Sequence, residues 1–350
     1  MKLLFIPHVP NLSVINRVYE FAKNSDSYFL TWNIDNSSLK AKISSQFHSL
    51  RFQEKDKLVQ IPLLFKPDSL APKFNTFMLN RLLKKLEIDA VVNANALLFD
   101  IKSICVPVIY DLVDDHLEIN EAIGLNKQRV QKIKEDVKNS VGVICVTSFV
   151  EKKAKLLHKN TTTIENGVYI ERFLKASSLR EKLRLGGKMV YGYIGGVEPW
   201  TGLGEACESY RKIADESTAF IVVGGNESSY YKSLVKEYAT EILFVGRVIP
   251  TAVADYFKTI DRGLIPFELN PFTNNALPIK ALEYALGGAD VLATKLHYLE
   301  HKNYPFVHFC ERENFSKGML YEKKEWEYDF NHLDWSYLAK DVKKFVGESI

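Results

Sequence analysis

Short apolar runs alternate with amphipathic stretches along the whole chain. The runs are of strand length, and most of them end at or just before Gly, Asn, Asp, Ser or Pro, which are turn residues. Apolar strands that alternate with helical patterns are typical of parallel sheets covered by helices. The pattern therefore predicts an α/β fold, with strands near residues 3–6, 28–32, 90–92, 106–111, 141–146, 189–194, 220–223, 242–245, 264–267 and 291–294.

Helical patterns fill the segments between these strands. The expected helices cover residues 14–22, 127–139, 149–157, 278–286 and an amphipathic stretch from Asp334 to Phe345. Ser148 is expected to cap the helix at 149–157. Pro278 is expected to open its helix, and Gly287 and Gly288 to close it.

Composition places the chain among ordinary globular proteins. It has 350 residues, of which 46% are hydrophobic and 25% charged, with a net charge of +3. This length suits about two domains. The charged stretch from Leu174 to Lys188, which contains Gly186 and Gly187, is the expected hinge between them.

Several function classes are disfavoured by the same inventory. The sequence contains no long Lys/Arg run of the kind that would indicate nucleic-acid binding. No apolar run approaches the ~18 residues that span a bilayer. The first apolar run is too short for a signal-peptide core. The four cysteines lack metal-ligand spacing, which favours reduced thiols and a cytoplasmic protein.

The region from Phe47 to Leu86 interleaves apolar and basic residues. A solvated helix face with snorkelling basic side chains is the favoured interpretation. Peripheral contact with an anionic membrane that carries a lipid-linked acceptor is the alternative. The basic residues concerned are Lys55, Lys57, Lys66, Lys73, Arg81, Lys84 and Lys85.

Polar residues follow two strands of the first half. His8 and Asn11 lie after the first strand, and loops at the carboxyl ends of parallel strands are where such folds bind ligands. Asp111, Asp114 and Asp115 crowd the end of another strand, where exclusion of water would raise a carboxylate pKa as a general base requires. Helix capping by Asp114 or Asp115, and a structural role for His8, are the competing interpretations.

The stretch from Leu264 to Gly288 carries the second candidate site. A strand is followed by a loop with Asn270 and Thr273 and by a helix that begins with Pro278 and Lys280. A polar loop before a helix start that bears Lys is a plausible phosphate seat. An ordinary αβ unit with a solvated pair of Lys280 and Glu283 is the competing interpretation.

Glycines follow the strands of the second half. Gly195-Gly196, Gly224-Gly225 and Gly246 come directly after apolar runs. Such glycines let backbone N–H groups approach a phosphate closely. No G-x-G-x-x-G fingerprint is present, which disfavours a nicotinamide enzyme.

The stretch from Leu264 to Gly288 resembles the nucleotide-sugar signature of GT-B glycosyltransferases, P-x-K-x-x-E-Y followed by A-x-G-x-x-V. The resemblance implies that Glu283 holds the donor ribose, and that Lys280 and the helix N-terminus at Pro278 face the diphosphate. Asn270 and Thr273 would contact the sugar or the phosphates. Motifs in the same order cover roughly residues 140–300.

Further implications come from the same resemblance. Gly195 and Gly196 would face the diphosphate, and Arg247-Val248 would lie by the nucleobase. The segment from Tyr110 to Asp115 resembles the Y-D-x-x-D-D element found where relatives carry a catalytic-domain His. Here Asp111, Asp114 and His116 compete for that role, and His8, Asn11 and His116 are the expected acceptor-binding residues.

The fold that the resemblance implies has two Rossmann-like domains facing a cleft. Residues 1–172 would bind the acceptor and residues 173–333 the nucleotide-sugar. Residues 334–350 would form a C-terminal helix that crosses back to the first domain.

Two positions depart from the family pattern. Many relatives carry Lys where this chain has Thr201, and Glu where it has Asn275. These departures leave the stereochemistry open. If the reaction inverts, Asp114 or Asp111 is the expected base for the acceptor hydroxyl. If it retains, Asp111 would orient the donor sugar.

The expected function is therefore a metal-independent glycosyltransferase. It would move a hexosyl-type sugar from a nucleotide-sugar, with a UDP-sugar favoured, to a glycan or lipid-linked acceptor. The alternative is a catalytically weakened nucleotide-sugar-binding or scaffold subunit with the same fold. No metal or other cofactor and no nucleic-acid partner is expected.

Overall fold

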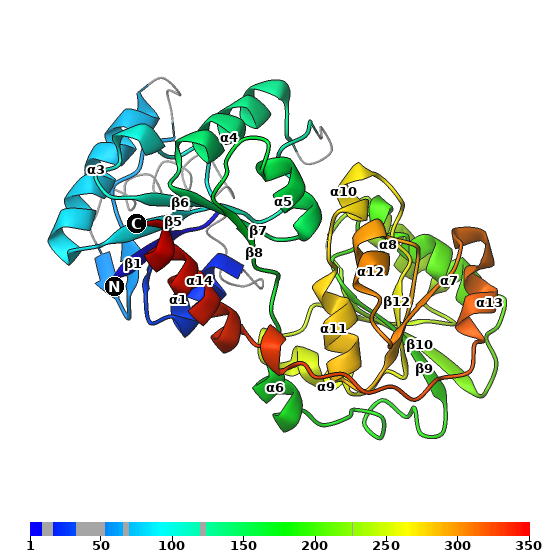
Figure 1. Cartoon of the computed structure of the whole chain (residues 1–350). Coiled ribbons are helices and arrows are strands. Elements are labelled where there is room, and N and C mark those ends of the chain that lie inside the picture. Colours follow the sequence, from blue (N-terminus) through cyan, green and yellow to red (C-terminus); the bar gives the residue numbers. More distant parts are fainter. Residues whose placement is uncertain (9–16, 33–52, 66–69, 120–123, 226) are drawn as a thin grey trace. The chain divides into compact units, whose positions relative to one another are not determined.

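The chain divides into two compact units. One comprises Met1–Gly167 with Trp335–Ile350, and the other Val168–Asp334. The computed structural model describes residues 1–8, 17–32, 53–65, 70–119, 124–225 and 227–350. Each unit is built on one sheet with helices packed against it (Figure 1).

The first unit holds an eight-stranded sheet in the order β3-β4-β2-β1-β5-β6-β7-β8. All pairs are parallel except β3–β4, a hairpin whose turn residues Asp56 and Lys57 have positive φ. The sequence pattern missed this hairpin. The strands are β1 (Leu3–Ile6), β2 (Tyr28–Leu30), β3 (Gln53–Lys55), β4 (Leu58–Gln60), β5 (Ala90–Asn93), β6 (Val108–Leu112), β7 (Gly142–Cys145) and β8 (Thr161–Thr163).

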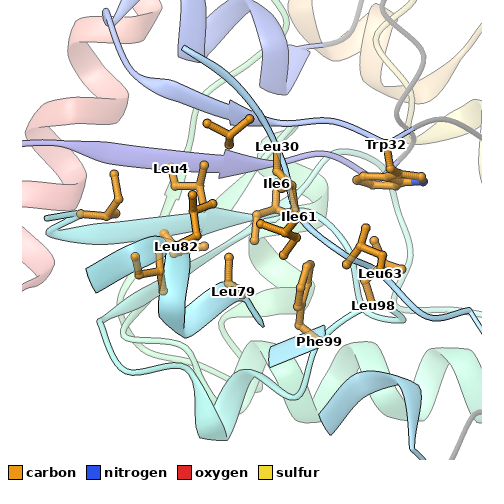
Figure 2. Close-up of a cluster of buried hydrophobic side chains, with 14 of the residues drawn as sticks. Leu4, Ile6, Leu30, Trp32, Ile61, Leu63, Leu79, Leu82, Leu98 and Phe99 are labelled. Carbon is orange, nitrogen blue, oxygen red and sulfur yellow. The ribbon is translucent and has the colours of Figure 1, made fainter. Parts of the chain in front are cut away.

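Helices bury the apolar side chains of this sheet. Figure 2 shows the core between α3 and strands β1, β2, β4 and β5, in which Leu4, Leu79 and Leu82 are essentially inaccessible to water. A second cluster joins α4 and α5 to β6 and β7. The helices are α1 (Arg17–Asn24), α3 (Ala71–Leu86), α4 (Lys127–Asn139), α5 (Ser148–Ala154) and α14 (Trp335–Ser349), with a 3-10 turn η1 (Ile101–Ser103).

The C-terminal helix α14 belongs to the first unit. Its Trp335 is fully buried and makes an edge-to-face contact with Phe21 of α1, with ring centroids 5.5 Å apart. Both helices lie side by side in Figure 1. The last segment of the chain thus returns to the sheet that the first segment begins, as the fold implied by the sequence requires.

The second unit holds a six-stranded parallel sheet in the order β11-β10-β9-β12-β13-β14. Its strands are β9 (Met189–Gly195), β10 (Thr218–Gly224), β11 (Leu243–Gly246), β12 (Arg262–Ile265), β13 (Asp290–Ala293) and β14 (Val307–Phe309). Its helices are α6 (Ile170–Lys175), α7 (Leu203–Arg211), α8 (Ser229–Tyr238), α9 (Val253–Phe257), α10 (Pro271–Asn274), α11 (Ile279–Leu286), α12 (His297–Lys302) and α13 (Phe315–Met319).

One buried tyrosine fixes α11 on this sheet. The Tyr284 hydroxyl donates to the Gly192 carbonyl oxygen at 3.0 Å and accepts from the Ile194 N–H at 2.8 Å. Gly263 leaves room for the ring, since an added Cβ would lie 2.2 Å from it. Lys280 and Glu283 are therefore carried on a helix whose position against β9 and β12 is tightly determined.

Two local expectations need correction, and a third lies partly outside the described residues. Thr147, and not Ser148, caps α5, because its side chain accepts from the Val150 N–H. Neither Asp114 nor Asp115 caps a helix, since both lie in an irregular segment after β6. Residues 14–16 of the first predicted helix lie outside the described residues, and α1 runs from Arg17 to Asn24.

The expected hinge from Leu174 to Lys188 is also corrected. This segment lies within the second unit. The Ser177 N–H donates to the Asp255 carboxylate at 2.9 Å, and the Leu179 N–H donates to the Thr259 hydroxyl at 2.8 Å. Charge and glycine content indicated a free linker, but these hydrogen bonds fasten the segment to the end of α9. Among the described residues, no helix is long and apolar enough to span a bilayer.

Candidate functional site

Lys280 is a half-buried cation held between two aromatic rings. Its Nζ lies 4.1 Å from the centroid of Tyr193 and 4.9 Å from that of Phe267. Loss of hydration lowers the pKa of Lys280 to about 7, and the charge of Glu283 opposes that shift. Across the described parts of the chain, no residue forms a hydrogen bond or ion pair with this ammonium group. A desolvated cation without an acceptor favours an anion beside it.

Glu283 lies one turn along the same helix and is also half-buried. Burial raises the pKa of Glu283 to about 7, while Lys280 and Arg172 favour its charged form. Arg172 of α6 is stacked over Tyr169, with the guanidinium carbon 3.7 Å from the ring centroid. The carboxyl group forms no hydrogen bond with any described residue, so its oxygens remain able to accept from the hydroxyls of a ligand.

The loop after β9 passes directly beside Lys280. A Cβ added to Gly195, whose φ is +141°, would lie 2.9 Å from the Lys280 Nζ. The Tyr193 hydroxyl donates to the Gly196 carbonyl oxygen at 2.6 Å and fixes the turn. Gly196 itself is exposed, with no atom within 4 Å of an added Cβ. The structure thus brings Gly195 and Lys280, predicted separately, to one place.

The loop before α11 is ordered by its own hydrogen bonds. The Thr273 N–H donates to the Asn270 side-chain oxygen at 3.0 Å, and the Asn270 N–H donates to the Thr273 hydroxyl at 3.0 Å. The same hydroxyl donates to the Glu268 carbonyl oxygen at 2.5 Å, and Thr273 is almost fully buried. These two residues cap the short helix α10, which the sequence pattern did not predict.

The remaining predicted donor-binding residues lie at the start of α11 and in the loop after β11. Pro278 is the N-cap of α11, so the helix begins one residue later than expected. Arg247 is exposed, and its Nε donates to the Gly225 carbonyl oxygen at 3.0 Å. Val248 follows it and is half-buried.

The two departures from the family pattern lie in the same unit. Thr201 is buried, and its hydroxyl donates to the Glu198 carbonyl oxygen at 2.7 Å. Thr201 thus closes its own turn and supplies no charge. Asn275 is half-buried in the loop before α11.

In the first unit, Asp111 is held by a buried arginine. Arg17 donates through Nε and Nη2 to the two carboxylate oxygens at 3.1 and 2.9 Å, and both side chains are almost fully inaccessible to water. Arg17 also donates to the Asn166 side-chain oxygen at 3.2 Å. Both carboxylate oxygens of Asp111 are thus engaged by Arg17, which makes this residue a weaker candidate than Asp114 for accepting a proton.

Asp114 is the carboxylate that remains. The side chain is half-buried, and no described residue donates a hydrogen bond to its carboxylate. Loss of hydration raises the pKa of Asp114 to about 7, and Arg17 opposes the shift. Its neighbour Asp115 accepts from the Lys153 ammonium at 2.6 Å, so the two adjacent carboxylates have different environments. A pKa near neutrality suits a general base.

Two histidines lie within electrostatic range of this carboxylate cluster. His8 follows β1 and is exposed, and Asn95 holds its backbone by donating to the His8 carbonyl oxygen at 3.2 Å. Partial loss of hydration of the imidazole lowers the pKa of His8, while the charge of Asp111 raises it. Burial, and then His8, lower the pKa of His116 to about 4. Both imidazoles are thus neutral near pH 7. Asn11 lies outside the described residues.

Sequence reasoning missed the residues that hold these groups in place. Arg17, Asn95, Tyr193 and Phe267 carry no motif of their own. Their roles depend on contacts between segments far apart in the chain, which periodicity and spacing do not reveal. Where the structure describes the chain, no group of three or more His, Cys, Asp or Glu side chains is arranged to hold a metal ion.

The sequence of this chain is similar to that of a curated bacterial protein. No family model matches the chain. It is 24% identical over 216 residues to TuaH of Bacillus subtilis, assigned as a teichuronic acid biosynthesis glycosyltransferase. The match covers 57% of this chain and 53% of that protein, so the chain spans about half the length of this relative.

Solved structures match over nearly the whole chain. HepE of Anabaena, in complex with UDP and glucose, has a TM-score of 0.69 at 14% identity, covering 99% of this chain and 100% of HepE. Sucrose-phosphate synthase from Thermosynechococcus elongatus has a TM-score of 0.70 at 13% identity, covering 99% and 98%. The chain has the GT-B fold. The fold predicted from the motifs is confirmed, and the site residues stay predictions.

Proposed function

We propose that this protein is a glycosyltransferase that uses a nucleotide-sugar donor, with a UDP-sugar favoured. The observation that carries the proposal is the Lys280 ammonium, which is half-buried beside Gly195 and lacks an acceptor among the described residues. A donor diphosphate is an anion of the right kind for this position. HepE, with the same fold, was solved with UDP-glucose, which supports the choice of nucleotide.

Cleavage of the sugar–phosphate bond leaves negative charge on the departing nucleoside diphosphate. We assign Lys280 the task of stabilising this charge, together with backbone N–H groups around Gly195 and Gly196 and the N-terminus of α11. Glu283 accepts hydrogen bonds from the ribose hydroxyls, and Arg247-Val248 contacts the base. A cation at this position supports a reaction without a divalent metal ion.

The acceptor is assigned to the first unit. Asp114, with a pKa of about 7, is the proposed base for the acceptor hydroxyl if the anomeric configuration inverts. His8 and His116 are the proposed contacts to the acceptor. A glycan or lipid-linked acceptor, and a role in polysaccharide synthesis, are supported by the assignment of TuaH to teichuronic acid biosynthesis.

The test has two stages. Thermal unfolding is first measured with UDP-, GDP-, ADP- and TDP-sugars, since a ligand that binds only the folded protein raises its melting temperature. We expect UDP-sugars to give the largest shift. Donor hydrolysis is then measured for the isolated protein with and without EDTA, and we expect activity in both. No shift with any donor would contradict the proposal, and loss of activity in EDTA would contradict the metal-independent part.

A catalytically weakened nucleotide-sugar-binding or scaffold subunit is the second candidate. It is favoured by Thr201 and Asn275, where a phosphate-binding cation and a sugar-binding carboxylate are absent. Both candidates predict donor binding. A specific thermal shift without donor hydrolysis, and without transfer to any acceptor supplied, would favour this second candidate.

A further inference from the structure

The outer face of α3 combines basic and large apolar side chains. Spacings of three and four residues place Lys73, Phe77, Arg81 and Lys84 along one stripe of the helix. All four are exposed. The opposite stripe, which includes Leu79, is buried in the core of Figure 2. The exposed stripe is therefore not needed for packing within the unit.

Two large apolar side chains lie on this exposed stripe. Phe77 is 59% exposed, and Leu70, the N-cap of α3, is also 59% exposed. They are spaced two turns apart on the same face. Isolated exposed apolar residues are ordinary, but an aromatic ring and a leucine on one helix face among cations form an interfacial pattern.

All charged residues of helix α3 itself are basic. Helix α3 carries Lys73, Arg81, Lys84 and Lys85 and no acidic residue. The neighbouring turn η1 adds exposed Lys102 and is fixed to α3, because Asn80 donates to the Ser103 carbonyl oxygen at 2.8 Å and accepts from the Cys105 N–H at 2.9 Å.

The carboxylates that follow α3 are already engaged. Glu87 pairs with the Lys2 ammonium at 2.9 Å, and Asp89 accepts from the Lys2 backbone N–H at 2.6 Å. The positive charge of the exposed stripe is thus not neutralised by the residues at the end of the helix.

We propose that the exposed face of α3 docks on an anionic lipid bilayer. Lys73, Arg81 and Lys84 attract the acidic headgroups, while Leu70 and Phe77 enter the boundary between headgroups and acyl chains. A nucleic-acid backbone would match the charges but would leave both apolar side chains in water. This inference does not depend on the donor site, since the vesicle experiment involves no nucleotide.

The experiment is vesicle cosedimentation of the full chain. One set of vesicles contains phosphatidylcholine with about one third phosphatidylglycerol, and the other contains phosphatidylcholine alone. We expect binding to the anionic vesicles only. Phe77→Ser should lower the partition coefficient about tenfold. Arg81→Gln with Lys84→Gln should lower it about twenty-fivefold, at about fivefold for each charge.

Matched control variants come from the second unit. Leu320→Ser removes an apolar side chain of similar exposure, 63%, and Lys232→Gln with Lys236→Gln removes two exposed charges from α8. Both controls should partition within about twofold of the wild type. Thermal unfolding of every variant shows whether the fold is intact, which the exposed positions lead us to expect.

Three outcomes would overturn the inference. The first is absence of wild-type binding to the anionic vesicles. The second is equal binding by the α3 variants and the controls. The third is a loss caused by the charge variants with none from Phe77→Ser, because that result would identify a surface for a soluble polyanion instead of a bilayer.

Discussion

At the scale of single residues, both candidate sites contain ionisable groups whose pKa values are displaced toward neutrality. Lys280 and Glu283 in the second unit, and Asp114 in the first, all have pKa values of about 7. In each case the leading cause is loss of hydration, and no described residue compensates it with a hydrogen bond. Burying an ionisable group without a hydrogen-bond partner costs folding stability. Groups with pKa values displaced in this way are therefore candidates for function.

The first prediction concerns protons taken up on donor binding. At pH 8 most Lys280 side chains in the free protein are neutral, because the pKa is about 7. A bound diphosphate favours the ammonium form and raises that pKa. UDP binding at pH 8 should therefore take up a proton, and affinity should fall as the pH rises above 7.

Calorimetry in two buffers of different ionisation enthalpy measures this uptake directly. Lys280→Met should abolish it. Equal proton uptake by the wild type and by Lys280→Met would show that another group takes the proton.

The second prediction concerns Asp114. Its pKa is about 7 in the folded protein against an ordinary value of 3.8. Between these values the folded state binds more protons than the unfolded state, so this residue makes stability fall as the pH rises toward 7. Asp114→Asn should therefore melt at a higher temperature than the wild type at pH 8, and at nearly the same temperature at pH 3.

The same variant should lose activity. If Asp114 is the general base, the transfer rate should fall about a hundredfold or more. The measurements are thermal unfolding at both pH values and initial transfer rates. Full activity in a stable Asp114→Asn protein would remove Asp114 from the mechanism and would favour a retaining reaction.

At the scale of elements, the glycine loop after β9 and helix α11 form one assembly. Tyr284 ties α11 to β9, and Tyr193 contributes both the ring beneath Lys280 and a hydrogen bond to the loop. Strand β9, the loop after it and helix α11 together determine the position of the Lys280 ammonium. A small change in the loop should therefore displace this ammonium.

The third prediction tests this assembly. Gly195→Ala places a Cβ 2.9 Å from the Lys280 Nζ at a φ of +141°, which L side chains rarely adopt. Affinity for UDP should fall about tenfold or more. Gly186→Ala is the control, since no atom lies within 4 Å of its added Cβ. Comparable affinities of the two variants in calorimetry would show that the ligand does not bind beside Gly195.

Many strands and helices could be predicted from the sequence, because their patterns depend on residues close together in the chain. The apolar runs predicted β1, β6 and β9, and the amphipathic pattern gave the bounds of α4 from Lys127 to Asn139. The β3–β4 hairpin was missed because its turn uses Asp56 and Lys57 at positive φ in place of glycine. Helix α10 was missed because its cap, formed by Asn270 and Thr273, resembles a polar binding loop in sequence.

The candidate sites could be predicted from the sequence only in part, because the contacts that form them join residues far apart in the chain. Lys280 and Glu283 were found through their motif, but the rings of Tyr193 and Phe267 around the ammonium come from other strands and loops. Asp111 looked like a base in sequence, and only the structure adds Arg17, from a distant helix, as its buried partner. Such pairings depend on tertiary structure, which no single stretch records.

At the scale of the whole molecule, the first unit is completed by the last helix of the chain. Trp335 is fully buried against Phe21, although the two residues stand at opposite ends of the sequence. The donor residues predicted from the sequence, in contrast, all belong to the second unit. Stability of the first unit and nucleotide binding by the second should therefore be separable.

The fourth prediction tests that separation. Trp335→Ala should destabilise the protein by about 3–5 kcal/mol through the cavity it leaves. Tyr337→Ala, on the same helix and 50% exposed, should change stability by less than about 0.5 kcal/mol. Denaturant unfolding measures both. Below the unfolding transition, UDP affinity should equal that of the wild type, and a loss of affinity would contradict independent units.

The central claim is that the ammonium of Lys280 receives the diphosphate of the donor. Titration of UDP into the wild type, Lys280→Met and the α8 control Lys232→Met in a calorimeter at pH 7 tests it most directly. The account predicts that Lys280→Met binds UDP at least about tenfold more weakly than the wild type, with Lys232→Met unchanged. Equal UDP affinity of all three proteins would contradict it.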